Sequence, residues 1–295
     1  MFRRRDNSPS GISHDARTHT LAGAGKEVNT EQAVLALQVG SHLDPGIKRK
    51  HRPIEDTLLV TQGIVPSASP STPPKPFALL IVADGVGGQA HGQEASRLSV
   101  QSLAKYVPGS LGSQQMKPEA FLHLLTAGVQ YANQLVYQHN REQRDHMGST
   151  MTAALVMDTT AYVAHVGDSR LYLYRQPTGL VQITRDHSLV ARLVEAGIIE
   201  SEGIYTHPMR NRIYRSLGEK ATVEVDVDAV PLAAGDLLLL CSDGLWEMVR
   251  DQQIAAILTT PMRHPSKTAH ALVQAALAGG GEDNVSVIVA QVSKV

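Results

Sequence analysis

The sequence predicts an α+β protein whose strands pair mainly as antiparallel neighbours. Two observations support this prediction. Four short apolar runs between residues 150 and 183 follow one another with only short turns between them, which is typical of antiparallel hairpins. Strand-like and helix-like segments also come in separate groups along the chain, and this grouping argues against a doubly wound parallel sheet.

Nine apolar runs are expected to form strands, because each is short and is bounded by turn residues. In chain order they lie at residues 33–37, 57–60, 77–83, 150–157, 161–166, 170–174, 180–183, 237–241 and 285–289.

Three helices are also expected. Apolar residues recur at helical spacing over residues 121–136 and again over residues 269–276, and we interpret both stripes as faces turned toward the core. A shorter helix is expected from about His187 to Ala196, with Asp186 as its N-cap and Gly197 as its stop.

The domain organisation follows from local composition. Residues 1–31 are polar and rich in Ser, His, Arg and Gly, which predicts a disordered tail. Residues 32–293 contain no break that would split a core, so we expect a single domain there. Residues 61–76 carry five prolines and several serines, and we interpret them as a loop insertion between two strands, tolerated at the surface.

Overall composition limits the partners that the chain can have. It has 295 residues, of which 42% are hydrophobic and 19% are charged, as in ordinary globular proteins. The net charge of −1 gives no bulk attraction to nucleic acid or to a membrane surface, and the three Phe and one Trp argue against base stacking. We therefore expect no nucleic-acid partner, no membrane partner and a monomeric state.

The single cysteine points to a compartment. Cys241 lies within an apolar run and has no second cysteine to pair with, which suits a reducing environment. The basic start, Met1 to Arg5, is not followed by the apolar segment of a secretory signal. These observations predict a cytoplasmic protein.

Three short acidic clusters stand at the ends of apolar runs. Asp84 in VADGVGG and Asp243 in CSDGL each follow such a run, and Asp283 in GEDNV precedes one. A carboxylate at the tip of a buried strand is costly unless a cation meets it, and no Lys or Arg is adjacent in these clusters. The pattern predicts a site for one hard divalent cation, or for two that share a ligand. Because glycine allows close approach of the backbone, the carbonyl of Gly85 is a further candidate ligand.

A basic run precedes a fourth acidic pair, Glu55–Asp56. The run consists of Lys48, Arg49, Lys50, His51 and Arg52. Two interpretations stay open: a solvated surface patch, or, beside a metal site, a grip for an anion such as phosphate.

Another carboxylate, Asp168, occupies an expected hairpin tip in AHVGDSRLY. Taken alone, it indicates a turn held by an ion pair between Asp168 and Arg170.

Other chemistries lack their motifs. The histidines are scattered without zinc-ligand spacing, and neither a G-x-S-x-G elbow nor a G-x-x-x-x-G-K-[ST] loop occurs. Cys241 has no neighbouring His or Arg, which argues against a nucleophilic cysteine phosphatase.

Eight segments, taken in order, resemble the motifs of the type 2C metal-dependent protein Ser/Thr phosphatases, and most closely their bacterial branch. The resemblance covers about residues 32–293. The segments are Glu55–Asp56, VADGVGG at 82–88, MGSTMTAAL at 147–155, AHVGDSRLY at 164–172, TRDHS at 184–188, HPMRN at 207–211, CSDGLWEMV at 241–249 and GGGEDNVSVIV at 279–289.

The resemblance implies a fold and a metal centre. The fold would be an α-β-β-α sandwich of two packed antiparallel sheets flanked by helices. Two Mn²⁺ or Mg²⁺ ions would lie in a cleft at the sheet edge, and a hydroxide between them would attack phosphorus in line, with no phospho-enzyme.

The same resemblance assigns roles to single residues, with Asp84, Asp243 and Asp283 as the catalytic carboxylates. Asp84 would bridge both ions, and Asp243 and Asp283 would complete one of them. Glu55 or Asp56, with the carbonyl of Gly85, would hold the other, partly through water. Asp168 would match the carboxylate of a third, weaker ion, with Asn211 near it.

The chain departs from the family pattern at the phosphate grip. The Arg usually found four residues before the Glu is His51, flanked by Arg49 and Arg52, and the usual Asn before Glu-Asp is Ile54. We therefore name His51, Arg52 and Arg49 as candidate phosphate-binding residues. Val86 replaces a residue that serves some members as an acid for the leaving group, so another group has to supply that proton.

These inferences converge on a phosphatase acting on phosphoserine and phosphothreonine in proteins, presumed targets of a Ser/Thr kinase. The alternative is a phosphoprotein-binding regulatory pseudophosphatase whose catalysis is weakened by the changes at His51 and Ile54. A third interpretation is a hydrolase of small phosphate esters. Retention of every strong metal carboxylate favours the first.

Overall fold

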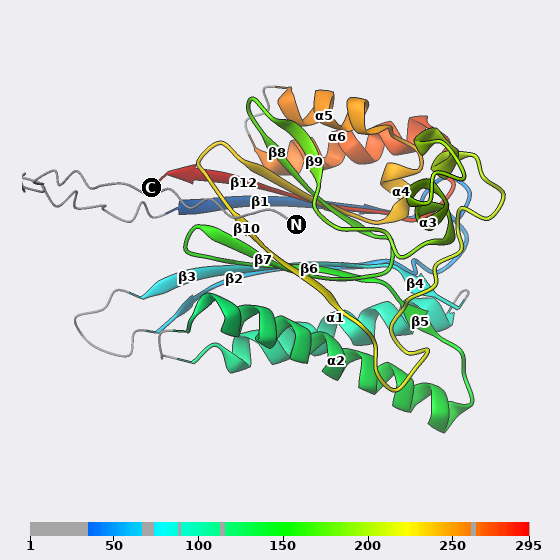
Figure 1. Ribbon diagram of the computed structural model, residues 1–295, viewed down its shortest axis with the longest axis horizontal. Coiled ribbons are helices and arrows are strands. Elements are labelled where there is room, and N and C mark those ends of the chain that lie inside the picture. Colours follow the sequence, from blue (N-terminus) through cyan, green and yellow to red (C-terminus); the bar gives the residue numbers. More distant parts are fainter. Residues whose placement is uncertain (1–34, 67–73, 88–89, 113–115, 261–263, 295) are drawn as a thin grey trace, which may run out of the picture. The chain divides into compact units, whose positions relative to one another are not determined.

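The computed structural model describes residues 35–66, 74–87, 90–112, 116–260 and 264–294. Two five-stranded sheets pack face to face, with helices on both outer faces (Figure 1). This is the α-β-β-α sandwich that the resemblance implies, and every paired neighbour in both sheets is antiparallel.

The first sheet has the strand order β1-β12-β11-β8-β9. Its strands are β1 (Leu35–Asp44), β12 (Val285–Lys294), β11 (Leu237–Cys241), β8 (Arg170–Arg175) and β9 (Gly179–Gln182). Its outer face packs against α4 (Asp243–Trp246), α5 (Asp251–Thr259) and α6 (Pro265–Ala278).

The second sheet has the order β10-β7-β6-β3-β2. Its strands are β10 (Asp226–Pro231), β7 (Thr160–Val166), β6 (Met151–Met157), β3 (Lys75–Ala83) and β2 (Thr57–Val65). Helices α1 (Ala90–Ser110) and α2 (Pro118–Gln143) cover its outer face, and a two-stranded ladder of β4 (Gly85–Val86) and β5 (Gly148–Ser149) adjoins it.

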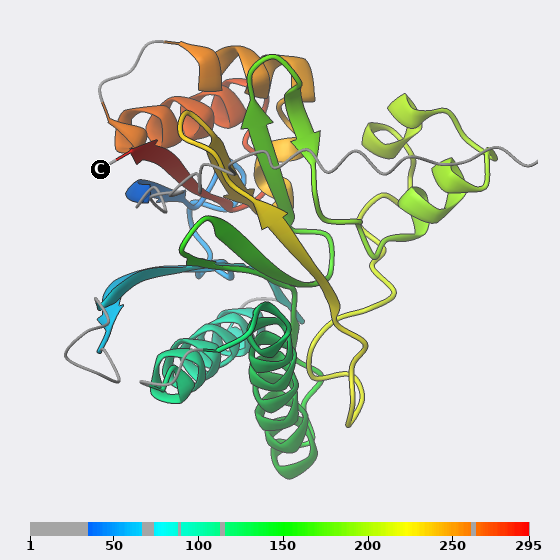
Figure 2. The ribbon, with the colours of Figure 1, turned by 60° about the vertical axis from the view of Figure 1, so that its left-hand side comes forward.

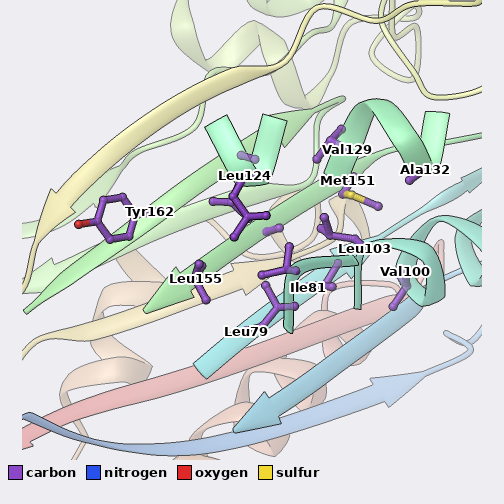
Figure 3. Close-up of a cluster of buried hydrophobic side chains, with 14 of the residues drawn as sticks. Leu79, Ile81, Val100, Leu103, Leu124, Val129, Ala132, Met151, Leu155 and Tyr162 are labelled. Carbon is purple, nitrogen blue, oxygen red and sulfur yellow. The ribbon is translucent and has the colours of Figure 1, made fainter. Parts of the chain in front are cut away.

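Burial explains why the central strands carry nearly unbroken apolar runs. Strands β3 and β6 are buried on both faces, one turned to the other sheet and one to the helices. Figure 3 shows the helix-facing side, where Leu79, Ile81 and Leu155 meet Leu103 and Val129. Such strands read as continuous apolar sequence rather than as an alternation.

Helix α1 was not predicted from the sequence. Its buried face includes Ser96, Ser99 and Ser102 beside Val100 and Leu103, so small polar residues interrupt the apolar stripe that periodicity depends on. The nine-residue α5 was also missed, because it is too short to show a clear period.

Several predicted boundaries are wrong. Strand β2 continues to Val65 and β3 begins at Lys75, with Ile64 paired to Pro76, so the predicted loop at 61–76 is shorter than expected. The β-branched residues Ile64 and Val65 favour extending the ladder. The remainder of that loop, residues 67–73, lies outside the described residues.

The predicted N-cap Asp186 is also wrong. Helix α3 (Leu189–Glu195) is capped by Ser188, whose side chain accepts a hydrogen bond from the Ala191 N–H at 3.3 Å. Asp186 is committed instead to an ion pair with Arg170.

Strands β7 and β8 do not form the expected hairpin, since they belong to different sheets. The turn at Gly167–Ser169 therefore carries the chain from one sheet to the other. Both inner faces are apolar, so the sequence pattern does not show which partner a strand chooses. The predicted tail at 1–31 lies outside the described residues, and its division from one catalytic domain stays a prediction.

Candidate metal centre

The acidic residues gather at one edge of the sandwich because of strand register. Thr57 pairs with Ala83 in the second sheet, which places Asp56 next to Asp84. Cys241 pairs with Val287 in the first sheet, which brings the segments of Asp243 and Asp283 together.

The pKa shifts of these carboxylates agree with their closeness at this edge. Burial raises the pKa of Asp84 well above its usual range, and Asp56, Asp243 and Asp283 raise it further. The pKa of Asp243 is likewise raised, by burial first and then by repulsion from Asp168 and Asp283. A cluster of this kind is stabilised by a cation.

Two of these groups have little access to solvent. Burial raises the pKa of Asp56 to about 6, although the nearby hydroxyls of Ser242 and Ser286 partly oppose this. For Asp168, burial raises the pKa to about 7, with a further contribution from Asp186. Perturbed acids at one edge of a fold mark a candidate functional site.

The donor atoms fit a hard divalent cation. Asp56 Oδ2 and Asp243 Oδ1 are buried and have no hydrogen-bond partner among the described residues. Buried carboxylate oxygens normally have partners, and oxygen ligands are those that Mg²⁺ and Mn²⁺ prefer. Among the described residues, no group of three or more His, Cys, Asp or Glu side chains is arranged to hold a metal ion.

Arg49 supplies the positive charge that the sequence did not place. Its guanidinium contacts Glu55 Oε2 at 2.6 Å and Asp283 Oδ2 at 2.8 Å. The expectation that the acidic clusters lack a cationic neighbour is therefore wrong for Asp283. Arg49 is distant in sequence from Asp283 but lies beside it in the fold.

Gly85 sits in a confined space that only glycine fits. A Cβ there would lie 2.0 Å from the Gly92 carbonyl oxygen and 2.7 Å from that of Glu55. Gly92, at the start of α1, is equally restricted: its Cβ would lie 2.8 Å from the Gly85 carbonyl oxygen and 3.0 Å from Glu55 Oε1. The sequence analysis did not identify Gly92. Its position near the start of a helix that follows VADGVGG would indicate a role, but only once α1 is known.

The backbone of Asp84 is fixed by the strand that begins MGSTMTAAL. Thr150 Oγ1 accepts a hydrogen bond from the Asp84 N–H at 2.8 Å, and the Thr150 N–H donates to the Asp84 carbonyl at 2.8 Å. The Thr150 hydroxyl also lies 2.8 Å from that of Ser169. Thr150 thus links the Asp84 tip to the turn that carries Asp168.

Asp168 is held through its backbone rather than by a side-chain ion pair. Trp246 Nε1 donates to the Asp168 carbonyl at 3.0 Å. Arg170 pairs with Asp186, with Nη2 to Oδ2 at 2.7 Å, and stacks 3.8 Å from the Trp246 ring. The predicted Asp168–Arg170 pair is therefore wrong, because the two-pronged partner of Arg170 is Asp186.

The remaining candidates are spread around the cluster. His51 and Arg52 are exposed and make no side-chain hydrogen bond or ion pair within the described part of the chain. Burial raises the pKa of Asp283, and Arg52 is close enough to oppose part of this rise. Val86 is 40% exposed. Asn211 is also exposed and makes no side-chain hydrogen bond among the described residues, so its place near a third ion stays a prediction.

A further carboxylate, Glu247, was missed by sequence reasoning. It raises the pKa of both Asp168 and Asp243, and burial raises its own pKa. Arg210 bridges it to Glu282, with Nε to Glu247 Oε2 at 3.3 Å and Nη2 to Glu282 Oε2 at 3.1 Å. Its position one helical turn after Asp243 is the sequence feature that would have identified it.

Fold and site together define a class: an α-β-β-α sandwich that presents hard oxygen ligands for divalent cations at one edge of its two sheets. Residues 72–279 match the family described as Protein phosphatase 2C. The chain belongs to this family.

Relatives with known names agree with this membership. The chain is 36% identical over 218 residues to "Serine/threonine phosphatase stp" of Listeria welshimeri, covering 72% of this chain and 84% of the relative. It is 39% identical over 216 residues to "Serine/threonine protein phosphatase PstP" of Mycobacterium tuberculosis, covering 72% of this chain and 40% of that protein.

Solved structures have the same fold. The catalytic domain of PstP in complex with two manganese ions superposes with a TM-score of 0.72 at 33% identity, covering 88% of this chain and all of that one. Stp1 from Staphylococcus aureus superposes with a TM-score of 0.75 at 30% identity, covering 87% of this chain and 95% of that one.

Proposed function

We propose that this chain is a metal-dependent protein phosphatase that hydrolyses phosphoserine and phosphothreonine in proteins. The observation that carries the proposal is the group of acidic residues at one edge of a protein phosphatase 2C sandwich, where Asp56 Oδ2 and Asp243 Oδ1 are buried without a hydrogen-bond partner among the described residues. Relatives named as serine/threonine phosphatases support the substrate class. No relative supports the pseudophosphatase alternative.

In this proposal each acidic residue has a part in holding two Mn²⁺ or Mg²⁺ ions. Asp84 faces both halves of the cluster and would be shared. Asp243 and Asp283 would hold one ion, while Glu55 or Asp56 and the Gly85 carbonyl would hold the other. Asp168 would serve a third, weaker ion. When bound, such ions supply Lewis-acid chemistry that activates water and offsets phosphoryl charge.

Basic residues beside the acidic cluster would orient the phosphate. Arg49, already at 2.6–2.8 Å from the acidic cluster, is placed to turn its planar fork toward a phosphate at the same edge. Arg52 stands next to it with no ion-pair partner in the described residues. Val86 has no proton to give, so the leaving alkoxide takes its proton from water or another group.

Finer features belong to the same proposal. The substrates would be proteins phosphorylated by a Ser/Thr kinase, and the enzyme would act as a monomer in the cytoplasm, where the buried single thiol of Cys241 stays reduced. No helix in the described segments is long and apolar enough to cross a membrane.

The proposal is tested by phosphate release from a phosphoserine peptide with Mn²⁺, with Mg²⁺ and with a chelator, beside p-nitrophenyl phosphate as a small ester. We expect turnover of the peptide with metal and none with chelator. Peptide binding without turnover would favour the pseudophosphatase. Turnover of the small ester alone would favour a hydrolase of small phosphates.

A further inference from the structure

A protruding segment is joined to the sandwich close to Asp168. This segment, which we call the flap, comprises residues 189–212 and contains α3 and the 3₁₀ helix η1 (Ser201–Tyr205). It stands out from the sheets in Figure 2, where it is coloured yellow-green. Its two ends meet in a neck: the Leu189 N–H donates to the Arg212 carbonyl at 2.8 Å, and the Tyr214 N–H donates to the His187 carbonyl at 2.9 Å.

His187, in this neck, grips the β7–β8 turn at two points. Its backbone N–H donates to the Gly167 carbonyl at 2.7 Å, and its ring Nδ1 lies 3.0 Å from the Gly167 N–H, which donates to it. The His187 side chain is only 1% exposed. Both polar groups of Gly167 are therefore satisfied by one residue.

The other ring nitrogen is fixed by charged groups. Since Nδ1 accepts a hydrogen bond, the neutral ring carries its proton on Nε2, which lies 3.1 Å from Asp226 Oδ2 and 2.9 Å from Arg215 Nη1. Arg215 holds the second oxygen of Asp226 at 2.6 Å. Asp226 begins β10 and Arg215 follows the flap, so the ring is oriented by groups from both sides of the neck, in the way that carboxylates orient metal-ligand histidines.

Position 167 requires a glycine. Gly167 has φ of +111°, and a Cβ on it would lie 2.6 Å from the Thr150 side chain. The next residue, Asp168, is held on its far side by Trp246. The direction of the Asp168 side chain therefore depends on two anchors, the His187 ring and the Trp246 indole.

We propose that His187 is a positioning residue that fixes the Gly167–Asp168 turn, so that the flap's neck and the carboxylate of Asp168 move as one unit. This inference rests on the proposed function of Asp168 as a ligand. His187 itself touches neither substrate nor the acidic cluster, and it acts only through Gly167.

Three variants of His187 separate positioning from simple packing. In His187→Asn the amide oxygen replaces Nδ1 and can accept from Gly167. In His187→Gln the amide reaches toward Asp226 but the acceptor for Gly167 is lost, and His187→Phe keeps only the ring volume. Val129→Ala, a buried position in α2, is the control for an unrelated loss of stability.

The measurements are amide hydrogen exchange at Gly167 and steady-state kinetics of the Mn²⁺-loaded enzyme on p-nitrophenyl phosphate. We expect His187→Gln and His187→Phe to speed hydrogen exchange at the Gly167 amide and to lower kcat roughly 10- to 100-fold. KM should change less than about twofold, since bound substrate does not contact His187. In His187→Asn, the exchange rate at Gly167 and kcat should both lie within a few fold of the wild-type values. Val129→Ala should leave both quantities near wild type.

The inference is wrong if His187→Gln frees the Gly167 amide yet keeps full kcat, or if Asn behaves like Phe. Should the His187 variants not fold, Asp226→Asn, which removes the support at Nε2, must lower kcat in the same way. Asp168→Asn distinguishes the proposed role of Asp168 from the positioning role of His187. If Asp168→Asn keeps full kcat, the role of Asp168 in the proposed function fails and this inference fails with it. If Asp168→Asn loses kcat while His187→Gln does not, only the positioning inference fails.

Discussion

At the scale of single residues, burial and like charge decide how the acidic cluster behaves. Asp168 is 4% exposed, and its pKa is raised to about 7 because the charged form is poorly solvated and faces other acids. An acid with a raised folded-state pKa destabilises the folded protein wherever it must ionise. The loss in free energy of unfolding caused by ionising Asp168 is complete above pH 7, and it disappears below the ordinary pKa of 3.8.

The first prediction follows from this pH dependence of stability. In chelator-treated protein, Asp168→Asn should raise the free energy of unfolding by about 1–4 kcal/mol at pH 8 and leave it unchanged near pH 4. Urea unfolding at both pH values measures this. Asp228→Asn, at an exposed position on β10, is the control and should show no such pH dependence. Equal effects of Asp168→Asn at both pH values would contradict the burial argument.

The second prediction concerns the altered phosphate grip. Arg49 contacts Glu55 and Asp283, whereas His51 is exposed without a side-chain contact in the described residues. Because a charged hydrogen bond contributes about 1.5–3 kcal/mol, Arg49→Ala should raise KM for a phosphopeptide about 10- to 100-fold, and His51→Ala should change it little. A larger rise of KM in His51→Ala than in Arg49→Ala would instead assign the grip to His51.

The third prediction concerns the thiol. Cys241 is fully buried at the end of β11, and burial raises its pKa, so it acts as a small apolar residue. Cys241→Ala should keep wild-type kcat and lower the free energy of unfolding by about 1 kcal/mol. If folded Cys241→Ala and Cys241→Ser were both inactive, the thiol would have a catalytic role.

At the scale of elements, the start of α1 matters for the site as much as the strand ends do. Gly92 lets the helix approach the Gly85 carbonyl and Glu55. The sequence predicted most of the strands because burial on both faces leaves apolar runs. It failed at α1, where serines occupy the buried face, and at the β7–β8 turn, where the same apolar pattern serves either sheet.

The fourth prediction tests that approach. In Gly92→Ala the added methyl group presses on the Gly85 carbonyl oxygen and Glu55 Oε1, so kcat should fall at least about tenfold while most of the stability remains. Gly109→Ala, where a Cβ meets nothing within 4 Å, is the matched control within the same helix. Wild-type kcat in folded Gly92→Ala would show that the Gly85 carbonyl is not a ligand.

At the scale of the whole molecule, the site exists only because two sheets meet. Asp56 and Asp84 lie at the ends of β2 and β3 in the second sheet. Asp243 begins α4 after β11, and Asp283 precedes β12, at the edge of the first sheet. Asp168 lies in the turn between the sheets. The residue patterns predicted that Asp84, Asp243 and Asp283 share a cation site, and the family resemblance added Glu55 or Asp56 and Asp168 to it. Long-range contacts such as Arg49 with Asp283, or His187 with Gly167, have no local sequence pattern, since they depend on how distant segments pack.

The most direct test compares phosphate release from a phosphoserine peptide by Asp84→Asn and by the wild-type protein at saturating Mn²⁺. The melting temperatures of the two proteins are measured alongside, to show that the variant is folded. Asp84 lies at the centre of the cluster, so the account predicts that Asp84→Asn folds and loses several orders of magnitude in kcat. Wild-type kcat in Asp84→Asn would contradict a metal centre built on these carboxylates.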